Sequence, residues 1–337
     1  MNWDKTKIQI ANGEIMEAQA PVILSASRST DIPAFYSDWF LNRLKEGYVK
    51  WKNPFNGVSS YVSFQNARLI VFWSKNPKPL IKHLDYLDQH AINYYFQFTL
   101  NDYDAEKLEP RVPDVQARID TFIELAAKVG KEKVIWRFDP LILTDKIGTD
   151  DLLRKVENIG NQLKSHTEKL VFSFADIKRY QKVQNNLRLN SIIYQEFDER
   201  TMNEFATGLQ RLNENWQFEL ATCAEQIPLE KYGIAHNKCI DDDLMIKLFP
   251  HDNVLMDFLG IQITPPDLFN PPNSLKKKRR NKDRGQRQFC GCIASKDIGE
   301  YNTCPHLCAY CYANANKNAA CANWHLHTLH PDKETIK

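Results

Sequence analysis

The most reactive stretch of this sequence lies near its end, where three cysteines are spaced by three and then by two residues. Cys304, Cys308 and Cys311 stand in the segment Cys-Pro-His-Leu-Cys-Ala-Tyr-Cys, and this spacing lets three sulfurs turn toward one point. Three thiolates hold three irons of a cubane [4Fe–4S] cluster and leave the fourth iron open, whereas a structural zinc site takes four protein ligands. The aromatic Tyr310 is expected to pack beside whatever the open iron binds. The spacing therefore predicts a cluster site with one open position.

Four further cysteines form a second candidate metal site. Cys223 ends an apolar run, Cys239 follows one loop later, and Cys290 and Cys292 are a tight pair. The glycine between that pair, Gly291, lets the backbone bend between the two sulfurs. Four thiolates from three loops would close a zinc site or an auxiliary cluster and tie the C-terminal segment to the rest of the fold. The alternative is that Cys223 and Cys239 are small buried hydrophobic residues.

The composition is that of an ordinary globular protein. Of the 337 residues, 43% are hydrophobic and 26% are charged, and a net charge of +2 indicates no acidic partner by itself. The first residues are mostly polar and no apolar run is long enough to span a bilayer, so we expect a cytoplasmic protein without contact to a membrane. Five of the eight cysteines crowd between Cys290 and Cys311, which in a reducing compartment favours metal binding over disulfides.

The elements that must position these cysteines follow a βα pattern. Short apolar runs alternate with longer amphipathic segments, which predicts an α/β fold built as an incomplete parallel (β/α) barrel, with a doubly wound open sheet as the alternative. We expect residues 1–263 to form the barrel and residues 264–337 to form a basic connector and a cluster-binding segment on its mouth. The predicted strands are Pro21–Ser25, Leu69–Trp73, Tyr94–Thr99, Val134–Phe138, Leu170–Ala175 and Phe218–Thr222.

The remaining elements are read from helical periodicity and turn signals. A weaker strand, Ser60–Phe64, is expected to pair as a hairpin with Leu69–Trp73, and the tail beyond Asn316 is weakly patterned and expected to fray. Helices are predicted from Pro113 to Gly130, after an N-cap at Asp198, and at Ser37–Gly47, Pro77–Gln89, Thr149–Lys164 and Asp241–Phe249.

Polar side chains follow every one of the predicted strands. In a parallel barrel the chemistry gathers at the carboxyl ends of the strands, so these side chains are expected to line one mouth. A carboxylate there suits ribose hydroxyls and an arginine suits a carboxylate or phosphate. The candidates for contact with a cofactor or substrate are Tyr310, Lys75, Arg137, Asp139, Ser173 and Asp176.

A basic run between Lys276 and Arg287 gives a further alternative. It holds eight lysines and arginines, which suits a phosphate backbone. It lacks the interleaved aromatics on which bases stack, so a solvated connector is the other interpretation.

With these residues assembled, the chain resembles the family catalogued as domain of unknown function 1848. The segments that carry the resemblance are residues 25–33, 73–77, 137–140, 222–225 and 290–314. The three-cysteine spacing also resembles that of radical S-adenosylmethionine (radical SAM) enzymes. Ser-Lys-Asn-Pro and Arg-Phe-Asp-Pro are similar to segments of the spore photoproduct lyase branch, which repairs DNA. Radical SAM barrels usually carry the cysteines after the first strand, where this chain has Ser27 to Asp31.

The resemblance implies a radical SAM-type iron–sulfur enzyme. Its cofactors would be a [4Fe–4S] cluster and S-adenosylmethionine, cleaved to a 5′-deoxyadenosyl radical that abstracts hydrogen from a small-molecule or nucleic-acid substrate. An electron donor such as flavodoxin or ferredoxin would be its partner. The alternatives are a non-catalytic iron–sulfur or zinc protein with a redox or structural role, and a nucleic-acid-binding protein.

Overall fold

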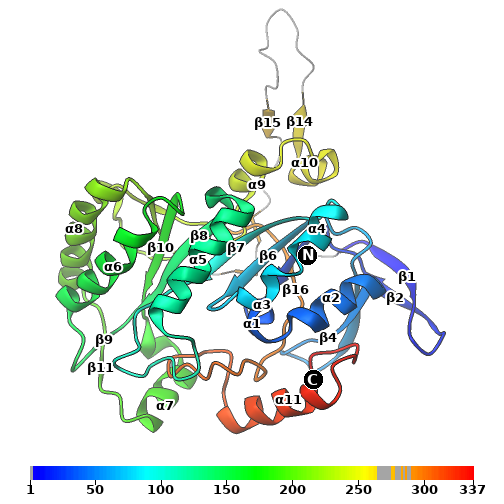
Figure 1. Ribbon diagram of the computed structural model, residues 1–337, viewed down its shortest axis with the longest axis horizontal. Coiled ribbons are helices and arrows are strands. Elements are labelled where there is room, and N and C mark those ends of the chain that lie inside the picture. The colour runs from blue at the N-terminus through cyan, green and yellow to red at the C-terminus, as the bar shows by residue number, and fades with distance from the viewer. Residues whose placement is uncertain (1–2, 264–274, 278–281, 284, 287–289) are drawn as a thin grey trace, which may run out of the picture.

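The molecule is organised around one large parallel sheet (Figure 1). The computed structural model describes residues 3–263, 275–277, 282–283, 285–286 and 290–337. Eight strands lie in the order β13-β12-β10-β8-β7-β6-β3-β16, and each neighbouring pair is parallel. From β3 to β13 the spatial order follows the chain order without reversal, and β16 returns to pair with β3. The bounds are β3 Ile23–Ala26, β6 Leu69–Ser74, β7 Asn93–Thr99, β8 Val134–Leu141, β10 Lys169–Phe174, β12 Glu219–Thr222, β13 Ile234–His236 and β16 Lys296–Asp297.

All six predicted strands of this sheet are confirmed within a few residues. The prediction missed β13 and β16, because strands of three and two residues leave no apolar run to detect. The predicted hairpin of Ser60–Phe64 with Leu69–Trp73 is wrong, because β3 and β7 occupy both edges of β6. That segment instead joins a second sheet of order β1-β2-β5-β4, made of Lys5–Gln9, Ile15–Gln19, Ser59–Ser63 and Tyr48–Lys52.

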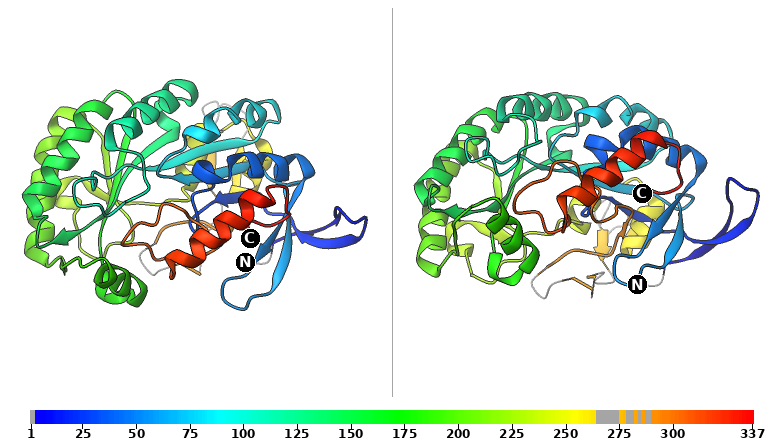
Figure 2. Two further views of the ribbon diagram at one scale, coloured as in Figure 1. Left: turned by 60° about the horizontal axis from the view of Figure 1, so that its bottom comes forward. Right: turned by 90° about the horizontal axis from the view of Figure 1, so that it is seen from below.

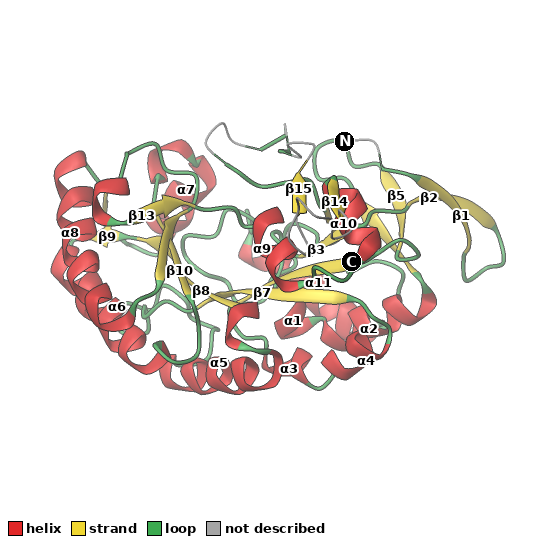
Figure 3. Cartoon of the chain, turned by 90° about the horizontal axis from the view of Figure 1, so that it is seen from above, coloured by secondary structure: helices red, strands yellow, loops and turns green. Residues whose placement is uncertain are grey.

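Helices lie along the outer side of the large sheet, as Figure 3 shows. Helix α8 begins where predicted, since the Asp198 carboxylate accepts from Thr201 N at 2.8 Å. The predicted Pro77–Gln89 helix is divided into two short helices, α3 and α4. The bounds are α1 Ile32–Phe35, α2 Ser37–Glu46, α3 Lys78–Ile81, α4 Leu84–Gln89, α5 Val115–Val129, α6 Thr149–Leu163, α7 Gln181–Leu189 and α8 Glu199–Trp216.

Both faces of the sheet are buried, each in its own apolar cluster. Alternate strand residues such as Phe72 and Phe96 pack toward the outer helices, while Val71 and Val171 face the other way. That inner cluster contains side chains of α9 (Asp242–Leu248) and α10 (Asn253–Leu259), and also Cys239, Cys290 and Cys292. Helix α10 is followed by a hairpin of β14 (Ile261–Ile263) and β15 (Leu275–Lys277).

The C-terminal segment crosses the inner side of the arc of strands (Figure 2). The prediction that the tail frays is wrong, because residues Lys317–Leu329 form helix α11, capped by the side chain of Asn316. The Trp324 ring packs edge-on against Phe35, and the buried His327 packs against Tyr36. Five of the eight basic residues in the run between Lys276 and Arg287 lie outside the described residues, and the nucleic-acid interpretation of this run stays a prediction. None of the helices in the described part of the chain is both long and apolar enough to cross a membrane.

The turn after β16 approaches the loop after β3 so closely that only glycine fits. A Cβ placed on Gly299 would lie 1.9 Å from the Oγ atom of Ser27, which accepts a hydrogen bond from Ser29 N at 2.9 Å. We expect Gly299→Ala to push this loop aside and to lower the free energy of unfolding by about 1–3 kcal/mol, as overpacking does. Urea titration measures it. Gly148→Ala, whose added methyl lies 3.7 Å from Asp151, is the control, and an equal loss in both variants would contradict the close approach.

Candidate functional site

The three-cysteine loop is docked on the carboxyl ends of three neighbouring strands. Asp31, Lys75 and Asn101 follow β3, β6 and β7. The Asp31 carboxylate accepts from His306 Nε2 at 2.8 Å. The hydroxyl of Tyr310 accepts from Lys75 Nζ at 2.9 Å and from Asn101 Nδ2 at 3.0 Å. The motif predicted from sequence thus lies at the edge of a parallel sheet where ligands usually bind.

Asp31 is the anchor of this contact on the side of β3. Its two carboxylate oxygens also accept from Ser74 Oγ and from Lys75 N, both at 2.7 Å. The other ring nitrogen of His306, Nδ1, lies 3.2 Å from the carbonyl oxygen of Arg111. Because both ring nitrogens are engaged and the ring is 2% exposed, the orientation of the His306 side chain is determined.

Glu109 is the anchor on the side of β6 and β7, and the sequence analysis missed it. Its buried carboxylate accepts from Lys75 Nζ at 2.7 Å, from Asn101 Nδ2 at 3.0 Å and from Arg118 Nη1 at 3.3 Å, and it also accepts from the Tyr310 hydroxyl. Burial alone would raise the pKa of Glu109, but the two cations outweigh it and lower this pKa to about 2. The carboxylate is therefore a fixed negative charge beneath the cysteine loop.

Cys304, Cys308 and Cys311 form the first group of thiols. Burial raises the pKa of each, to about 12 for Cys304, and the charges of all three interact with one another. Asn314 N donates to Cys311 Sγ at 3.3 Å, and the Lys75 ammonium is close enough to favour the Cys308 thiolate. Buried thiols ionise when a metal supplies positive charge, and N–H donors to sulfur tune such ligands. The donor set therefore fits an iron–sulfur cluster.

Three of the predicted cofactor-binding residues form a second connected group beside it. Arg137 Nε donates to Asp139 Oδ2 at 3.1 Å, and Arg137 Nη1 donates to Gln97 Oε1 at 3.0 Å. Ser173 Oγ donates to the other oxygen of the same carboxylate. Asp139 N donates to Asn101 Oδ1 at 2.9 Å, which joins this group to the hydroxyl of Tyr310. The strand ends of β6, β7, β8 and β10 thus share one polar network.

Asp176 is not part of this network. Asp176 stands two residues past the end of β10, and its side chain is 53% exposed. Its carboxylate lies 3.9 Å from the guanidinium of Arg179. Within the described part of the chain this carboxylate is not hydrogen-bonded to the other predicted site residues, so its role in cofactor binding stays a prediction.

The second group of cysteines is also brought together, from three separate segments. Cys223 Sγ lies 3.5 Å from Cys239 Sγ, and Cys239 N donates to Cys292 Sγ at 3.2 Å. Cys290 and Cys292 interact side by side across Gly291, and none of the four is in a disulfide. The Arg137 guanidinium connects this group to the polar network, since Nη1 also donates to Cys239 Sγ at 3.2 Å.

Two residues that sequence reasoning missed are central to the site. His306 stands inside the cysteine motif and Glu109 stands in the loop after β7, ahead of α5. A histidine between two cysteines was a signal that could have been used. Nothing local distinguishes Glu109 from a surface glutamate, because its cations stand 34 residues before it, at Lys75, and nine residues after it, at Arg118, and only the fold brings the three together.

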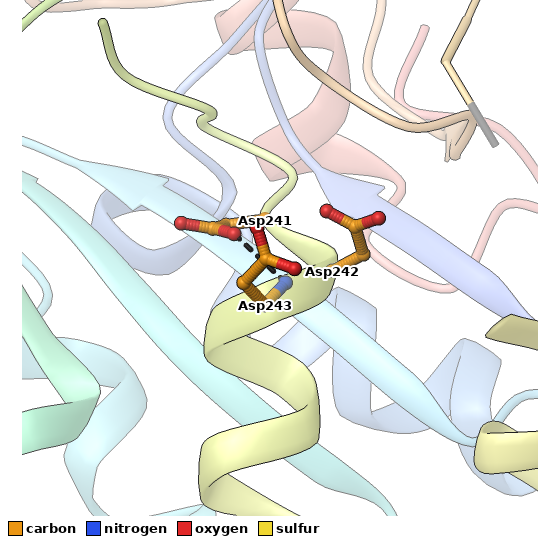
Figure 4. Close-up of side chains that lie close together, drawn as sticks. All are labelled: Asp241, Asp242 and Asp243. Atoms are coloured by element: carbon orange, nitrogen blue, oxygen red, sulfur yellow. Dashed lines mark hydrogen bonds between the residues drawn. The ribbon is translucent and has the colours of Figure 1, made fainter. Parts of the chain in front are cut away.

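An acidic cluster at the start of α9 is explained without a metal (Figure 4). The carboxylate oxygens of Asp241, Asp242 and Asp243 all lie within 4.8 Å of one another. Among the described residues, no three sulfurs of either cysteine group lie as close together. Asp241 Oδ1 caps the helix by accepting from Asp243 N at 3.0 Å. Lys238 Nζ lies 2.8 Å from Asp242 and also pairs with Asp243. A helix cap and ion pairs therefore account for these carboxylates.

Fold and site together define an α/β protein in which a C-terminal cysteine loop is docked on the strand ends of a large parallel sheet. The chain belongs to the family described as Domain of unknown function (DUF1848), whose sequence profile matches residues 23–313. This match confirms the family predicted from the sequence.

The other comparisons add no argument. One similar solved structure is that of a proposed alpha-L-fucosidase from Bacteroides thetaiotaomicron. The two sequences are 8% identical, and the match covers 51% of this chain and 77% of the other chain. Its TM-score of 0.27 is too low to carry a conclusion about the fold. No curated protein matches this chain significantly.

Glu109→Gln tests the buried anchor. At pH 7 the change removes the carboxylate from the half-buried Lys75 and leaves the buried Arg118 with Asp104 as its remaining acidic partner, so the free energy of unfolding should fall by up to about 3–5 kcal/mol. The native-state pKa of Glu109 lies below its unfolded-state value, so its stabilisation is present above about pH 4.3 and is lost as the pH falls toward 2. The difference in the free energy of unfolding between wild type and variant should therefore become smaller as the pH falls. Denaturant unfolding at several values between pH 7 and pH 3 measures it.

The control for this prediction is Glu124→Gln. Glu124 pairs with Lys78 at the surface, where its side chain is 46% exposed. This change should alter the free energy of unfolding by less than about 1 kcal/mol. A Glu109→Gln variant as stable as the control at pH 7 would show that the buried carboxylate does not hold the loop.

Proposed function

We propose that this protein is a radical SAM-type iron–sulfur enzyme in which Cys304, Cys308 and Cys311 bind a [4Fe–4S] cluster. The observation that carries the proposal is the docking of the three-cysteine loop on the carboxyl ends of β3, β6 and β7 through His306 and Tyr310. A loop that served only to end the chain would not need buried charged partners on three strands.

The fold that goes with this proposal is a partial parallel (β/α) barrel. Its support is the strand order, which follows the chain from β3 to β13 and brings the last strand, β16, back to the first. A doubly wound sheet would reverse its order at a switch point. The opening of such a barrel would lie between β13 and β16, the two ends of the strand order.

The cluster-binding residues would act as follows. When bound, a cluster held by three thiolates has one open iron, which in radical SAM enzymes holds S-adenosylmethionine and delivers the electron that cleaves it. Backbone N–H groups of Asp31 and His306 are directed at Cys304, and those of Ala313 and Asn314 at Cys311. These donors stabilise negative charge on sulfur and would support the ionised form of the ligands once a cluster is bound.

The polar network would receive the cofactor and the substrate. Lys75 carries its positive charge beside Cys308, because Glu109 and Cys308 raise the pKa of Lys75 against the opposing effect of burial. Asp139 is the reachable carboxylate of the group, with a side chain 22% exposed, and suits the ribose hydroxyls of a nucleoside. Arg137 is fully engaged by Asp139, Gln97 and Cys239, and its part is to orient Asp139.

Replacing any one of Cys304, Cys308 and Cys311 by Ala should abolish loading of this cluster. After anaerobic reconstitution, iron content should fall by about four per chain, and the electron paramagnetic resonance signal of the reduced cluster should disappear. In the wild type, S-adenosylmethionine should change that signal, because the ligand binds the open iron.

Cys321→Ala is the control, since Cys321 lies on α11 outside both cysteine groups. Its iron content and its signal should equal those of the wild type. Unchanged iron in all three loop variants would refute the assignment of the ligands. A cluster whose signal ignores S-adenosylmethionine would leave an iron–sulfur protein without the proposed chemistry.

A further inference from the structure

We propose that Cys223, Cys239, Cys290 and Cys292 form a closed structural zinc site, separate from the three-cysteine loop. Cys223 directly follows β12, Cys239 lies three residues past β13, and the Cys290–Cys292 pair precedes β16. The contacts between sulfurs run in the order Cys223, Cys239, Cys292, Cys290, with 3.5 Å between the first two. Four thiols from three segments of the chain thus form one row of pairwise contacts inside the fold.

The sulfurs are surrounded by donors of the kind that thiolate ligands receive. Cys292 Sγ accepts from Cys239 N at 3.2 Å and from Ile240 N at 3.4 Å. Cys239 Sγ accepts from Asn237 Nδ2 at 3.4 Å. Neutral thiols are weak acceptors and do not require several N–H donors, whereas metal-bound thiolates are held in place by them.

Two arginines, the buried Arg137 and the half-buried Arg28, face the group with positive charge. Arg137 Nη1 donates to Cys239 Sγ at 3.2 Å. Arg28 interacts electrostatically with Cys292 and Cys239, and its Nη2 atom is buried without a hydrogen-bond partner among the described residues. A zinc ion with four thiolates carries two net negative charges. The guanidinium groups offset that charge, although the carboxylates of Asp139 and Asp297 also face them.

One sulfur–sulfur distance in the group matches two ligands of the same zinc ion, although no three of the four sulfurs, all of them in described residues, lie within 4.8 Å of one another. Thiolates about 2.3 Å from a tetrahedral zinc ion are about 3.8 Å apart, close to the 3.5 Å between Cys223 and Cys239. A cube places iron and sulfide between its cysteine ligands and separates them further. Zinc would draw the two end sulfurs, Cys223 and Cys290, in from the row to complete the tetrahedron.

Such a site would fasten the returning C-terminal segment to the sheet. β16 has two residues and pairs only with β3 among the described strands. Its backbone hydrogen bonds alone would therefore stabilise the position of this segment only weakly. Zinc ligation by the pair just before β16 would join it to the ends of β12 and β13, on the other side of the strand order. The three-cysteine loop follows β16 and would be positioned by the same link.

The test counts metals in the full-length chain purified under reducing conditions with zinc in the growth medium. The wild type should hold about one tightly bound zinc ion, with an X-ray absorption spectrum of four sulfurs at about 2.3 Å. Cys290→Ser and Cys292→Ser should lower zinc by at least about tenfold. Cys321→Ser should not lower it.

A second measurement on the wild type avoids dependence on variants that fold poorly. Displacing the metal with a mercurial thiol reagent should release zinc to a colorimetric chelator in proportion to the thiols titrated. Iron in place of zinc in a Cys304→Ala variant, a Cys223–Cys239 disulfide in the purified protein, or no metal at all would each overturn the site. Because the cluster is counted as iron and this site as zinc, failure of either proposal is distinguishable from failure of the other.

Discussion

Two buried carboxylates, Asp31 and Glu109, hold the C-terminal loop against the sheet, and the candidate site depends on them. Both accept hydrogen bonds from the sheet side and from the loop side. Asp31 accepts from the backbone N of Lys75 and from the ring of His306. Glu109 accepts from Lys75 Nζ and from the hydroxyl of Tyr310. A buried carboxylate is costly unless its oxygens are satisfied; at Glu109 the charges of Lys75 and Arg118 outweigh burial, and at Asp31 several hydrogen-bond donors satisfy both oxygens. Such a contact tolerates little displacement, so it determines where the three sulfurs lie relative to the strand ends.

The loop after β3 serves both cysteine groups. Its Arg28 carbonyl accepts from the Tyr312 hydroxyl at 2.8 Å, next to Cys311, while its guanidinium faces Cys239 and Cys292. Arg28 N also donates to Asp297, which ends β16. The loop has no cysteine of its own and contacts the cysteine segments that return from the C-terminus.

The two faces of the large sheet pack against different parts of the chain. Outer-facing strand residues bury the amphipathic helices, while inner-facing residues pack on α9, α10 and the four-cysteine group. The polar side chains of the site lie in the last residues of the strands, as Arg137, Asp139 and Ser173 do, or in the loops that follow them, as Lys75 and Asn101 do. There the network from Asp31 through Tyr310 to Asp139 and Ser173 spans five consecutive strands.

The sequence by itself determined the parts of this protein that depend on local pattern. Continuous apolar runs identified the six longer strands, the three-and-two spacing identified the cysteine loop, and the positions after each strand identified Lys75, Arg137 and Asp139. It did not reveal β13, β16 and α11, whose stability comes from pairing and aromatic packing rather than from periodicity. Only the tertiary structure decided that Glu109 lies between two cations, that His306 binds Asp31 and that Asp176 stays outside the network. Those contacts join segments up to 275 residues apart, and the energy that selects them exists only once both segments are buried together.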